Sequence, residues 1–214
     1  MADVAASASP AAPGPARRRV PPVVLVGMMG AGKSTVGRRL ASRLGRPFVD
    51  ADDELVRRSG RTVREWFAEE GEDGFRAAEA ALLADLLAAP GPAVIAAGGG
   101  VVTRPRNREA LRGGARVVYL RAGAPFLRSR LERKPHRPLL DDDPEAVLVR
   151  LLDERSALYE EVADLVVDVE PFHSEHERPK RELAARIAEL VEAAEATGAA
   201  EVDRAAGRAG EPGR

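Results

Sequence analysis

The segment from Gly27 to Thr35 (GMMGAGKST) limits the possible folds of this chain more than any other. It fits the pattern G-x-x-x-x-G-K-[ST], and it lies between an apolar run, Val23–Val26, and an amphipathic stretch. Glycines let backbone N–H groups approach phosphate oxygens, and the N-terminus of the following helix adds the positive end of its dipole. Lys33 is placed to reach the β- and γ-phosphates, and the Ser34 hydroxyl to bind Mg²⁺. The pattern predicts a phosphate-binding loop whose ATP contacts come from six residues: Gly30, Ala31, Gly32, Lys33, Ser34 and Thr35.

Short apolar runs and amphipathic segments alternate along the rest of the chain. The runs are rich in β-branched residues and are predicted to be buried strands: Val23–Val26, Pro47–Val49, Ala93–Ala96, Val117–Leu120 and Leu165–Val167. Helices are predicted over Lys33–Leu44, Glu72–Leu87, Arg106–Leu111, Pro125–Leu131, Pro144–Val162 and Pro179–Ala194. This alternation predicts βαβ units and an α/β fold, a three-layer sandwich around a five-stranded, mainly parallel sheet. Ligands bind such sheets at the carboxyl ends of the strands.

Length and composition predict one compact domain. Among the 214 residues, we expect the domain to occupy 21–196, between disordered tails at 1–20 and 197–214. Lys and Arg number 33 against 34 Asp and Glu, so the net charge favours neither nucleic acid nor an anionic membrane as a partner. The chain has no cysteine, which excludes disulfides, zinc thiolate sites and thiol nucleophiles. Without a signal peptide or an apolar run near the roughly 20 residues that span a bilayer, we expect a cytoplasmic protein.

Two charged segments could complete a site beside the loop, and each has a simpler explanation. Asp50 and Asp52 follow the second strand, where carboxylates can hold magnesium-bound water or accept a hydroxyl proton. Asp52 or Asp53 could instead cap the next helix. Arg76 and Glu79 are three residues apart and share a helix face, so the pair could brace an arginine that grips a carboxylate. A surface ion pair is the alternative.

Two further segments leave similar alternatives open. Gly98–Gly100 follow a predicted strand, where they permit close backbone approach to a ligand or form a flexible turn. The basic, proline-interrupted segment around Arg130–Leu140 could be a lid that delivers an arginine to the developing charge. It could also be a solvated loop.

In order and spacing, these segments resemble shikimate kinase from about Val23 to Val167. The shared motifs are G-x-x-G-x-G-K-S/T at Gly27–Thr35, D-x-D at Asp50–Asp52, F-R-x-x-E at Phe75–Glu79, triple glycine at Gly98–Gly100, R-P-L-L at Arg137–Leu140 and R-x-x-L-Y at Arg155–Tyr159. The resemblance implies a P-loop NTPase fold of the nucleoside-monophosphate-kinase type, with a lid at about 131–143. It also implies transfer of the ATP γ-phosphate, with one Mg²⁺, to the 3-hydroxyl of shikimate.

The resemblance also implies roles for single residues. Lys33, Asp52 and Arg137 would be catalytic, with Asp52 as base or orienting group and Arg137 closing on the phosphates. Asp50 would join Ser34 around the magnesium through water, and Arg130 would stack on adenine.

On the acceptor side, the implied shikimate contacts are Asp52, Arg76, Gly98, Gly99, Gly100, Arg155, Phe67 and Phe75. Arg76 and Arg155 would clamp the carboxylate, and Glu79 would hold Arg76 in place. Trp66 would either line the acceptor pocket or pack in the core.

Three departures from the family pattern affect single positions. Ala51 stands where the family commonly has threonine, and Ala97 replaces the threonine usual before the triple glycine. After Asp168, the next helix-starting proline comes about five residues late, so the adenine contacts of this loop stay unassigned. Two histidines in this loop, His173 and His176, could bind a metal, although solvated side chains are the simpler interpretation.

Two rival functions remain at this stage. A gluconate kinase is disfavoured by the pair Arg76 and Arg155, together with the motifs F-R-x-x-E and R-P-L-L. A nucleotide-dependent switch without catalysis is disfavoured because Lys33, Asp52 and Arg137 are all present. We therefore expect a monomeric enzyme acting on ATP and shikimate, with no nucleic-acid or membrane partner.

Overall fold

The computed structural model describes residues 20–131, 144–172 and 177–209. Predictions for 1–19, for the lid at 132–143, for His173 and His176, and for 210–214 lie outside the described residues.

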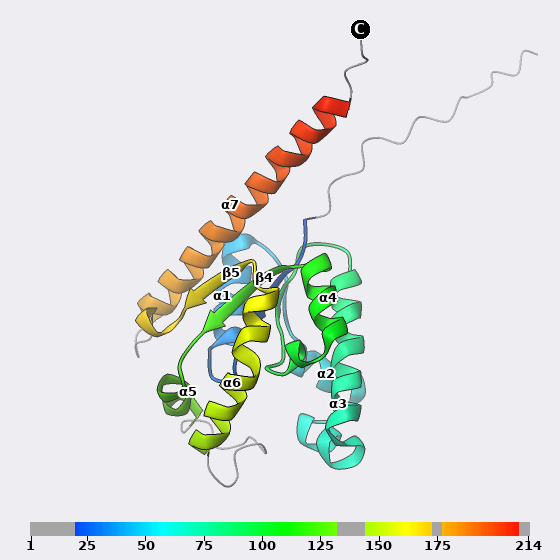
Figure 1. Ribbon diagram of the computed structural model, residues 1–214, viewed down its shortest axis with the longest axis vertical. Coiled ribbons are helices and arrows are strands. Elements are labelled where there is room, and N and C mark those ends of the chain that lie inside the picture. The colour runs from blue at the N-terminus through cyan, green and yellow to red at the C-terminus, as the bar shows by residue number, and fades with distance from the viewer. Residues whose placement is uncertain (1–19, 132–143, 173–176, 210–214) are drawn as a thin grey trace, which may run out of the picture.

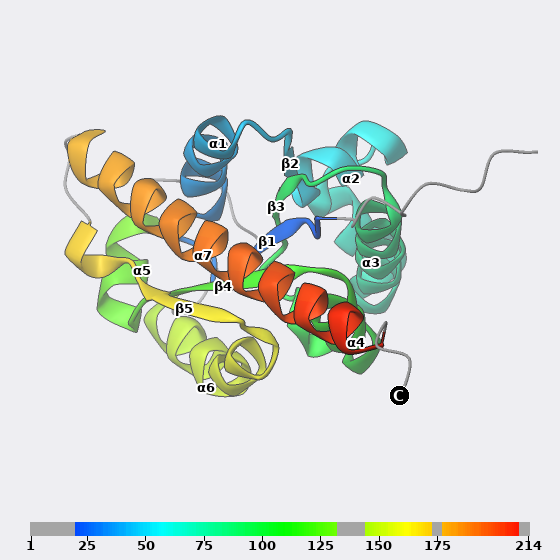
Figure 2. The same cartoon turned by 90° about the horizontal axis from the view of Figure 1, so that it is seen from above.

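A five-stranded parallel sheet forms the centre of the protein (Figures 1 and 2). Its strands are β1 (Val23–Val26), β2 (Phe48–Asp50), β3 (Val94–Ala96), β4 (Arg116–Arg121) and β5 (Leu165–Asp168), in the order β2-β3-β1-β4-β5. The central strand β1 is completely buried, as expected for a β-branched run covered on both faces. The predicted fold class is confirmed; β1 has the predicted bounds, and the ends of the other strands differ from the predicted ones by at most one residue.

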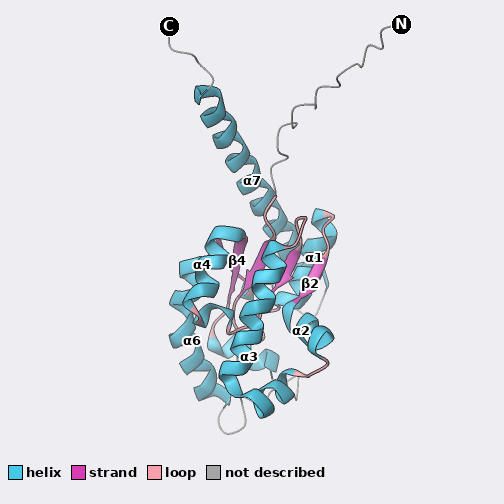
Figure 3. Cartoon of the chain, turned by 90° about the vertical axis from the view of Figure 1, so that its right-hand side faces the viewer, coloured by secondary structure: helices cyan, strands magenta, loops and turns pink. Residues whose placement is uncertain are grey.

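Helices cover both faces of the sheet. They are α1 (Lys33–Leu44), α2 (Ala51–Ser59), α3 (Val63–Ala88), α4 (Pro105–Gly114), α5 (Ala124–Leu131), α6 (Pro144–Val162) and α7 (Glu177–Ala209), with short 3₁₀ turns η1 (Val101–Thr103) and η2 (Glu170–Phe172). Helices α1 and α7 pack together on one face, and α3, α4 and α6 lie over the other (Figures 2 and 3). Among the helices of the described ranges, none combines the length and apolar character that crossing a bilayer requires.

Helix α3 begins earlier than predicted. Thr62 and Glu65 form a capping box, in which the Thr62 side chain accepts from the Glu65 N–H and Glu65 accepts from the Thr62 N–H. The helix then kinks at Gly71, where φ is 69° and ψ is −175°, a backbone region that only glycine occupies readily. The prediction of a helix starting at Glu72 therefore identified only the second of two joined segments.

Helix α7 ends later than predicted. It runs to Ala209 instead of ending near Ala194, so residues 197–209, which we expected to be disordered, are helical. The alanine, glutamate and arginine that suggested a disordered tail are also strong helix formers. Beyond the sheet, α7 projects away from the body of the protein (Figure 1).

Two apolar clusters hold the layers together. The main cluster includes the sheet, α1 and α7, and Leu148 and Leu151 of α6. A smaller cluster lies between α2 and α3, centred on Leu55, Phe75 and Leu82. This second cluster shapes the part of the molecule next to the predicted acceptor site.

Candidate active site

A cavity of about 680 Å³ opens at the carboxyl ends of the strands, a size typical of small-molecule sites. Fifteen of the predicted site residues line it: Gly30, Gly32, Lys33, Ser34, Thr35, Asp50, Asp52, Phe67, Phe75, Arg76, Gly98, Gly99, Gly100, Arg130 and Arg155. Ala31 is a buried residue of the loop and is not among the lining residues. Arg137 lies outside the described residues. The fold thus brings most of the separately predicted segments to one place.

The phosphate-binding loop has the backbone that its glycines permit. Gly27 has φ of 139°, and a Cβ there would lie 2.6 Å from the carbonyl oxygen of Leu120. The ammonium of Lys33 donates to the carbonyl oxygens of Gly27 and Met28 at 2.8 and 3.0 Å. Helix α1 begins at Lys33, so its N-terminus faces the cavity with the loop. A hollow with this charge and backbone geometry suits phosphate groups.

Asp50 and Asp52 lie where β2 passes into α2. Oδ1 of Asp50 accepts from the N–H of Asp52 at 3.2 Å, which makes Asp50 the N-cap of α2. The alternative that Asp52 or Asp53 caps this helix is therefore wrong. Because both Asp50 and Asp52 line the cavity, the cap does not remove either carboxylate from the site.

Arg76 and Glu79 form a buried ion pair. Nη1 of Arg76 donates to Oε2 of Glu79 at 2.9 Å, so the predicted bracing is confirmed and the surface alternative is wrong. Burial raises the pKa of Glu79, an effect that the positive charge of Arg76 partly offsets. Arg76 also contacts the more exposed Glu72 at 3.3 Å.

The triple glycine makes room for this ion pair. An ideal Cβ on Gly98 would lie 2.2 Å from Oε1 of Glu79 and 3.2 Å from Oδ1 of Asp52. A Cβ on Gly100 would lie 2.2 Å from Cζ of Arg76. Sequence analysis considered a ligand contact or a flexible turn, and it missed this packing because the neighbours lie far away in the chain.

Arg155 is a buried cation on the same side of the cavity. It is 6% exposed, and its Nη1 donates to the carbonyl oxygen of Gly99 at 3.4 Å. Within the described part of the chain, Arg155 forms no ion pair with a carboxylate, and its Nε has no hydrogen-bond partner. A buried guanidinium is costly without an anion, so this position suits a carboxylate supplied by a ligand.

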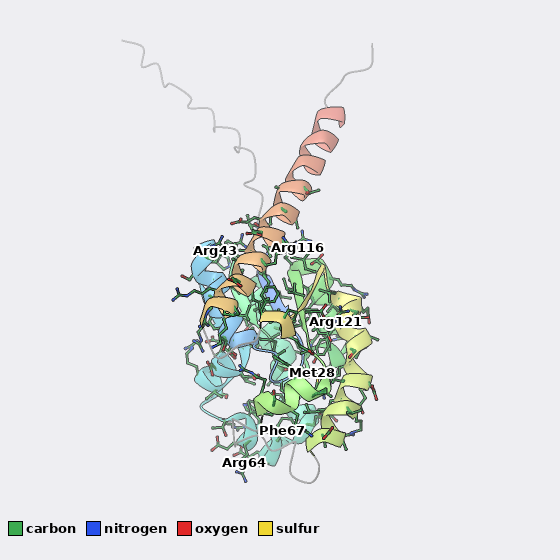
Figure 4. All side chains as sticks on the ribbon, turned by 90° about the vertical axis from the view of Figure 1, so that its left-hand side faces the viewer. Met28, Arg43, Arg64, Phe67, Arg116 and Arg121 are labelled. Carbon is green, nitrogen blue, oxygen red and sulfur yellow. The ribbon has the colours of Figure 1, made fainter. Side chains whose placement is uncertain are left out.

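Aromatic rings form the apolar wall of the cavity. The rings of Phe67 and Phe75 lie 4.9 Å apart, and Phe67 lies at the end of the molecule opposite the projecting part of α7 (Figure 4). Trp66 does not line the cavity, because its indole N–H donates to the Ser59 hydroxyl at 3.1 Å and its ring packs in the smaller cluster. Trp66 is therefore a core residue that backs the cavity wall through its cluster with Phe67 and Phe75.

Sequence analysis missed three residues at the start of α3 that also line the cavity, Thr62, Val63 and Arg64. The capping box T-x-x-E at Thr62–Glu65 was the signal that could have found them, since it marks a helix start next to Phe67. At the carboxyl end of β5, Asp168 forms a two-bond contact with Arg121, at 2.6 and 2.9 Å. Arg121 lowers the pKa of Asp168.

Comparison with known proteins decides the family. The sequence model of the family described as Shikimate kinase matches residues 29–192, which is most of the chain. The chain belongs to the shikimate kinase family. A shikimate kinase from Pseudomonas syringae pv. tomato is 48% identical over 173 residues, which cover 78% of this chain and 96% of the relative. One from Pseudomonas putida KT2440 is 46% identical over 171 residues, covering 79% of this chain and 95% of the relative.

Solved shikimate kinase structures have the same fold. A structure from Acinetobacter baumannii, in complex with shikimate, gives a TM-score of 0.74 at 40% identity and covers 81% of this chain and 94% of that one. A structure from Bacteroides thetaiotaomicron gives 0.73 at 31% identity, covering 79% of this chain and 97% of that one. The P-loop fold and the family predicted from the motifs are both confirmed.

Proposed function

We propose that this protein is an ATP-dependent shikimate kinase that forms shikimate 3-phosphate and ADP. In this reaction the 3-hydroxyl oxygen bonds to the γ-phosphorus, the bond to the β,γ-bridging oxygen breaks, and the hydroxyl proton passes to a base. The observation that supports it most strongly is Arg155, buried beside the phosphate loop without an ion-pairing carboxylate among the described residues. Its guanidinium and that of Arg76 line the same cavity as Lys33, so an anionic acceptor held there would face the phosphates.

We infer that the side chains act mainly by positioning and by neutralising charge, which is what phosphoryl transfer requires of a protein. Lys33 would leave its loop carbonyls for phosphate oxygens, and Asp52 would orient the attacking hydroxyl and accept its proton. Arg76 and Arg155 would hold the carboxylate of the acceptor. Arg130 for adenine and Arg137 for the phosphates stay predictions from the family resemblance.

The residues fit a single Mg²⁺ held mainly by ATP. The Ser34 hydroxyl and the Asp50 carboxylate line one cavity and offer the hard oxygen ligands that magnesium prefers. In the described ranges no three His, Cys, Asp or Glu side chains gather into a metal site, so phosphates and water would have to supply the other ligands. When bound, Mg²⁺ would neutralise charge on the β- and γ-phosphates.

ADP release measured with three acceptor conditions tests the function. Shikimate should support turnover, whereas gluconate and the reaction without acceptor should give only background. Turnover with gluconate alone would support a different small-molecule kinase. Equal ADP release without any acceptor, or none with shikimate, would overturn the proposal.

The replacement Asp52→Asn tests the inferred base. It should abolish turnover while leaving the ATP affinity, measured by calorimetry, within about twofold, since it removes one carboxylate next to the acceptor. Asp53→Asn is the matched control, because Asp53 is an adjacent carboxylate with a side chain that is 76% exposed. An equal loss of ATP affinity in Asp52→Asn would show that Asp52 serves the nucleotide instead.

The monomeric state and the cytoplasmic location stay predictions, as does the lack of a nucleic-acid or membrane partner. Light scattering coupled to size-exclusion chromatography would check the oligomeric state.

A further inference from the structure

Tyr159 ends the R-x-x-L-Y motif, and the proposed reaction gives it no task. It lies four residues after Arg155 on α6, so the two side chains share one helix face. Its side chain is completely buried and does not line the cavity. A buried hydroxyl needs hydrogen-bond partners, and those of Tyr159 come from both halves of the site.

The hydroxyl of Tyr159 lies where three segments meet. It donates to the carbonyl oxygen of Gly99, the same oxygen that accepts from Nη1 of Arg155. The Arg155 guanidinium also lies close enough to the Tyr159 phenol for its positive charge to offset part of the rise that burial causes in the pKa of Tyr159. Sδ of Met28, in the phosphate-binding loop, lies 3.6 Å from the Tyr159 hydroxyl oxygen. One hydroxyl therefore contacts α6, the glycine run and the phosphate loop.

We propose that Tyr159 is a positioning residue that orients Arg155 for the acceptor carboxylate and links this arginine to the phosphate loop. This role rests on the proposed function. Two donors converge on one acceptor: the single proton of the Tyr159 hydroxyl goes to the carbonyl oxygen of Gly99, which also accepts from Nη1 of Arg155. Burial raises the pKa of Tyr159, so the phenol stays protonated and keeps donating.

The benefit to binding is preorganisation. A free arginine side chain populates many rotamers, and fixing it before the ligand arrives removes that entropic cost from binding. In the described residues, Nε of Arg155 has no hydrogen-bond partner, so the guanidinium is oriented by the bond from its Nη1 to the Gly99 carbonyl, which Tyr159 also holds. Two-point binding of a carboxylate depends on this orientation.

The chain contains a matched control for the test. Tyr119 stacks on Tyr159 with ring centroids 5.0 Å apart, and it too is buried. It lies near Ser156 and does not line the cavity. Tyr159→Phe and Tyr119→Phe therefore each remove one buried hydroxyl from the same aromatic stack, and only the first removes a bond to the Gly99 carbonyl that holds Arg155.

Steady-state kinetics with shikimate and ATP would separate positioning from packing. Tyr159→Phe should raise the KM for shikimate up to about tenfold, the size of one lost hydrogen bond, and leave the KM for ATP within about twofold. Tyr119→Phe should leave both within about twofold. Equal effects of the two variants on the shikimate KM would overturn the role.

A double-mutant cycle tests whether Tyr159 acts through Arg155. With Arg155→Ala already present, adding Tyr159→Phe should change kcat/KM for shikimate by less than about twofold. The same tenfold loss in both backgrounds would show that Tyr159 acts independently. An active wild type with either contrary result would overturn only this role, whereas a wild type inactive on shikimate would overturn the proposed function as well.

A spectroscopic measurement does not depend on how well Tyr159→Phe folds. Because the chain has only two tyrosines, ¹³C labelling at the tyrosine ring carbon that bears the hydroxyl gives two NMR signals, which Tyr119→Phe assigns. Shikimate should shift the Tyr159 signal of the wild-type protein, and Arg155→Ala should abolish that shift. A Tyr159 signal unchanged by shikimate would contradict the coupling.

Discussion

Nη1 of Arg76 lies 2.9 Å from Oε2 of Glu79, and the two side chains are only 8% and 6% exposed. The other carboxylate oxygen of Glu79 faces Gly98 and has no hydrogen-bond partner among the described residues. Glu79 therefore uses one oxygen to fix Arg76 and holds the other beside Asp52. The acceptor arginine on α3 is held by a carboxylate, while Arg155 on α6 is held by a backbone carbonyl that a phenol also contacts.

Replacing Glu79 by Gln should weaken both stability and acceptor binding. The amide keeps one acceptor but loses the charge, so we expect the free energy of unfolding to fall by about 2 kcal/mol and the shikimate KM to rise. Urea denaturation and steady-state kinetics measure the two effects. Glu72→Gln is the control: the Glu72 side chain contacts the same guanidinium but is 62% exposed, so its loss should cost less than about 0.5 kcal/mol. Similar losses in both variants would show that burial does not determine the strength of this pair.

Alanine at each glycine of the triple-glycine run should give a graded result. Gly98→Ala and Gly100→Ala place a Cβ 2.2 Å from Glu79 and from Arg76, so each should displace the ion pair and raise the shikimate KM at least tenfold. Gly99→Ala has no atom nearer than 3.6 Å, so the free energy of unfolding should stay within about 0.5 kcal/mol of wild type. Thermal unfolding of all three variants checks the order. Equal destabilisation at the three positions would contradict the steric explanation.

Gly71→Ala tests the kink in α3. A Cβ there meets nothing within 4 Å, so the cost comes only from the backbone, whose φ of 69° and ψ of −175° disfavour alanine. We expect a loss of about 1–3 kcal/mol in chemical denaturation. Gly113→Ala in α4 is a control with the opposite expected sign. The position is helical and a Cβ there also meets nothing within 4 Å, so the change should raise the free energy of unfolding by about 0.5–1 kcal/mol. Two changes of the same sign would show that the kink is not strained.

The stability of α2 should depend on pH through Glu54. Hydrogen bonds from Arg57 and Arg58 lower the pKa of Glu54 from 4.5 to about 2. A carboxyl with a lowered pKa in the folded state stabilises fully above its unfolded pKa, and this contribution is lost as the pH falls from 4.5 towards 2. The difference in the free energy of unfolding between wild type and Glu54→Gln, measured by denaturation, should therefore shrink as the pH falls from about 6 to about 3.

Glu192→Gln is the control for this titration, because Glu192 is an exposed α7 residue with no ion pair among the described residues. The free energy of unfolding of Glu192→Gln should differ little from that of wild type, and by nearly the same amount at each pH. A Glu54→Gln difference that does not change over the same range would show that the two arginines do not lower the pKa of Glu54.

Sequence patterns predicted the bounds of a helix or strand correctly where residues close together in the chain determine them. The bounds of β1, α1 and α6 match their predictions, because each has a clear apolar period and a loop or proline at its start. The kink at Gly71 was missed because it joins two helices whose separate patterns do not reveal the connection. Helix length at the end of α7 was missed because composition alone does not separate a helix from a disordered tail.

The same distinction between local and long-range causes applies to the residues of the site. Asp52, Arg76 and Arg155 were identified from motif spacing, and all three line the cavity. The steric need for Gly98 and Gly100 was not predictable, since it depends on side chains about twenty residues away in the chain that only the fold brings close. For the same reason, the contacts of the Tyr159 hydroxyl with Gly99 and Met28 emerged only from the structure.

The packing of α7 on α1 has a consequence for folding during protein synthesis. Helix α7 packs on α1, the helix that begins at Lys33, through the apolar side chains of Leu183, Ile187 and Val191, and the ion pair of Glu195 with Arg46 adds a contact just after α1. Because α7 follows every other described element, the side of α1 that it covers stays exposed until α7 has been translated. The helix next to the phosphate-binding loop therefore completes its packing only after α7 leaves the ribosome. A nascent chain arrested before α7 should bind ATP weakly and expose apolar surface to chaperones.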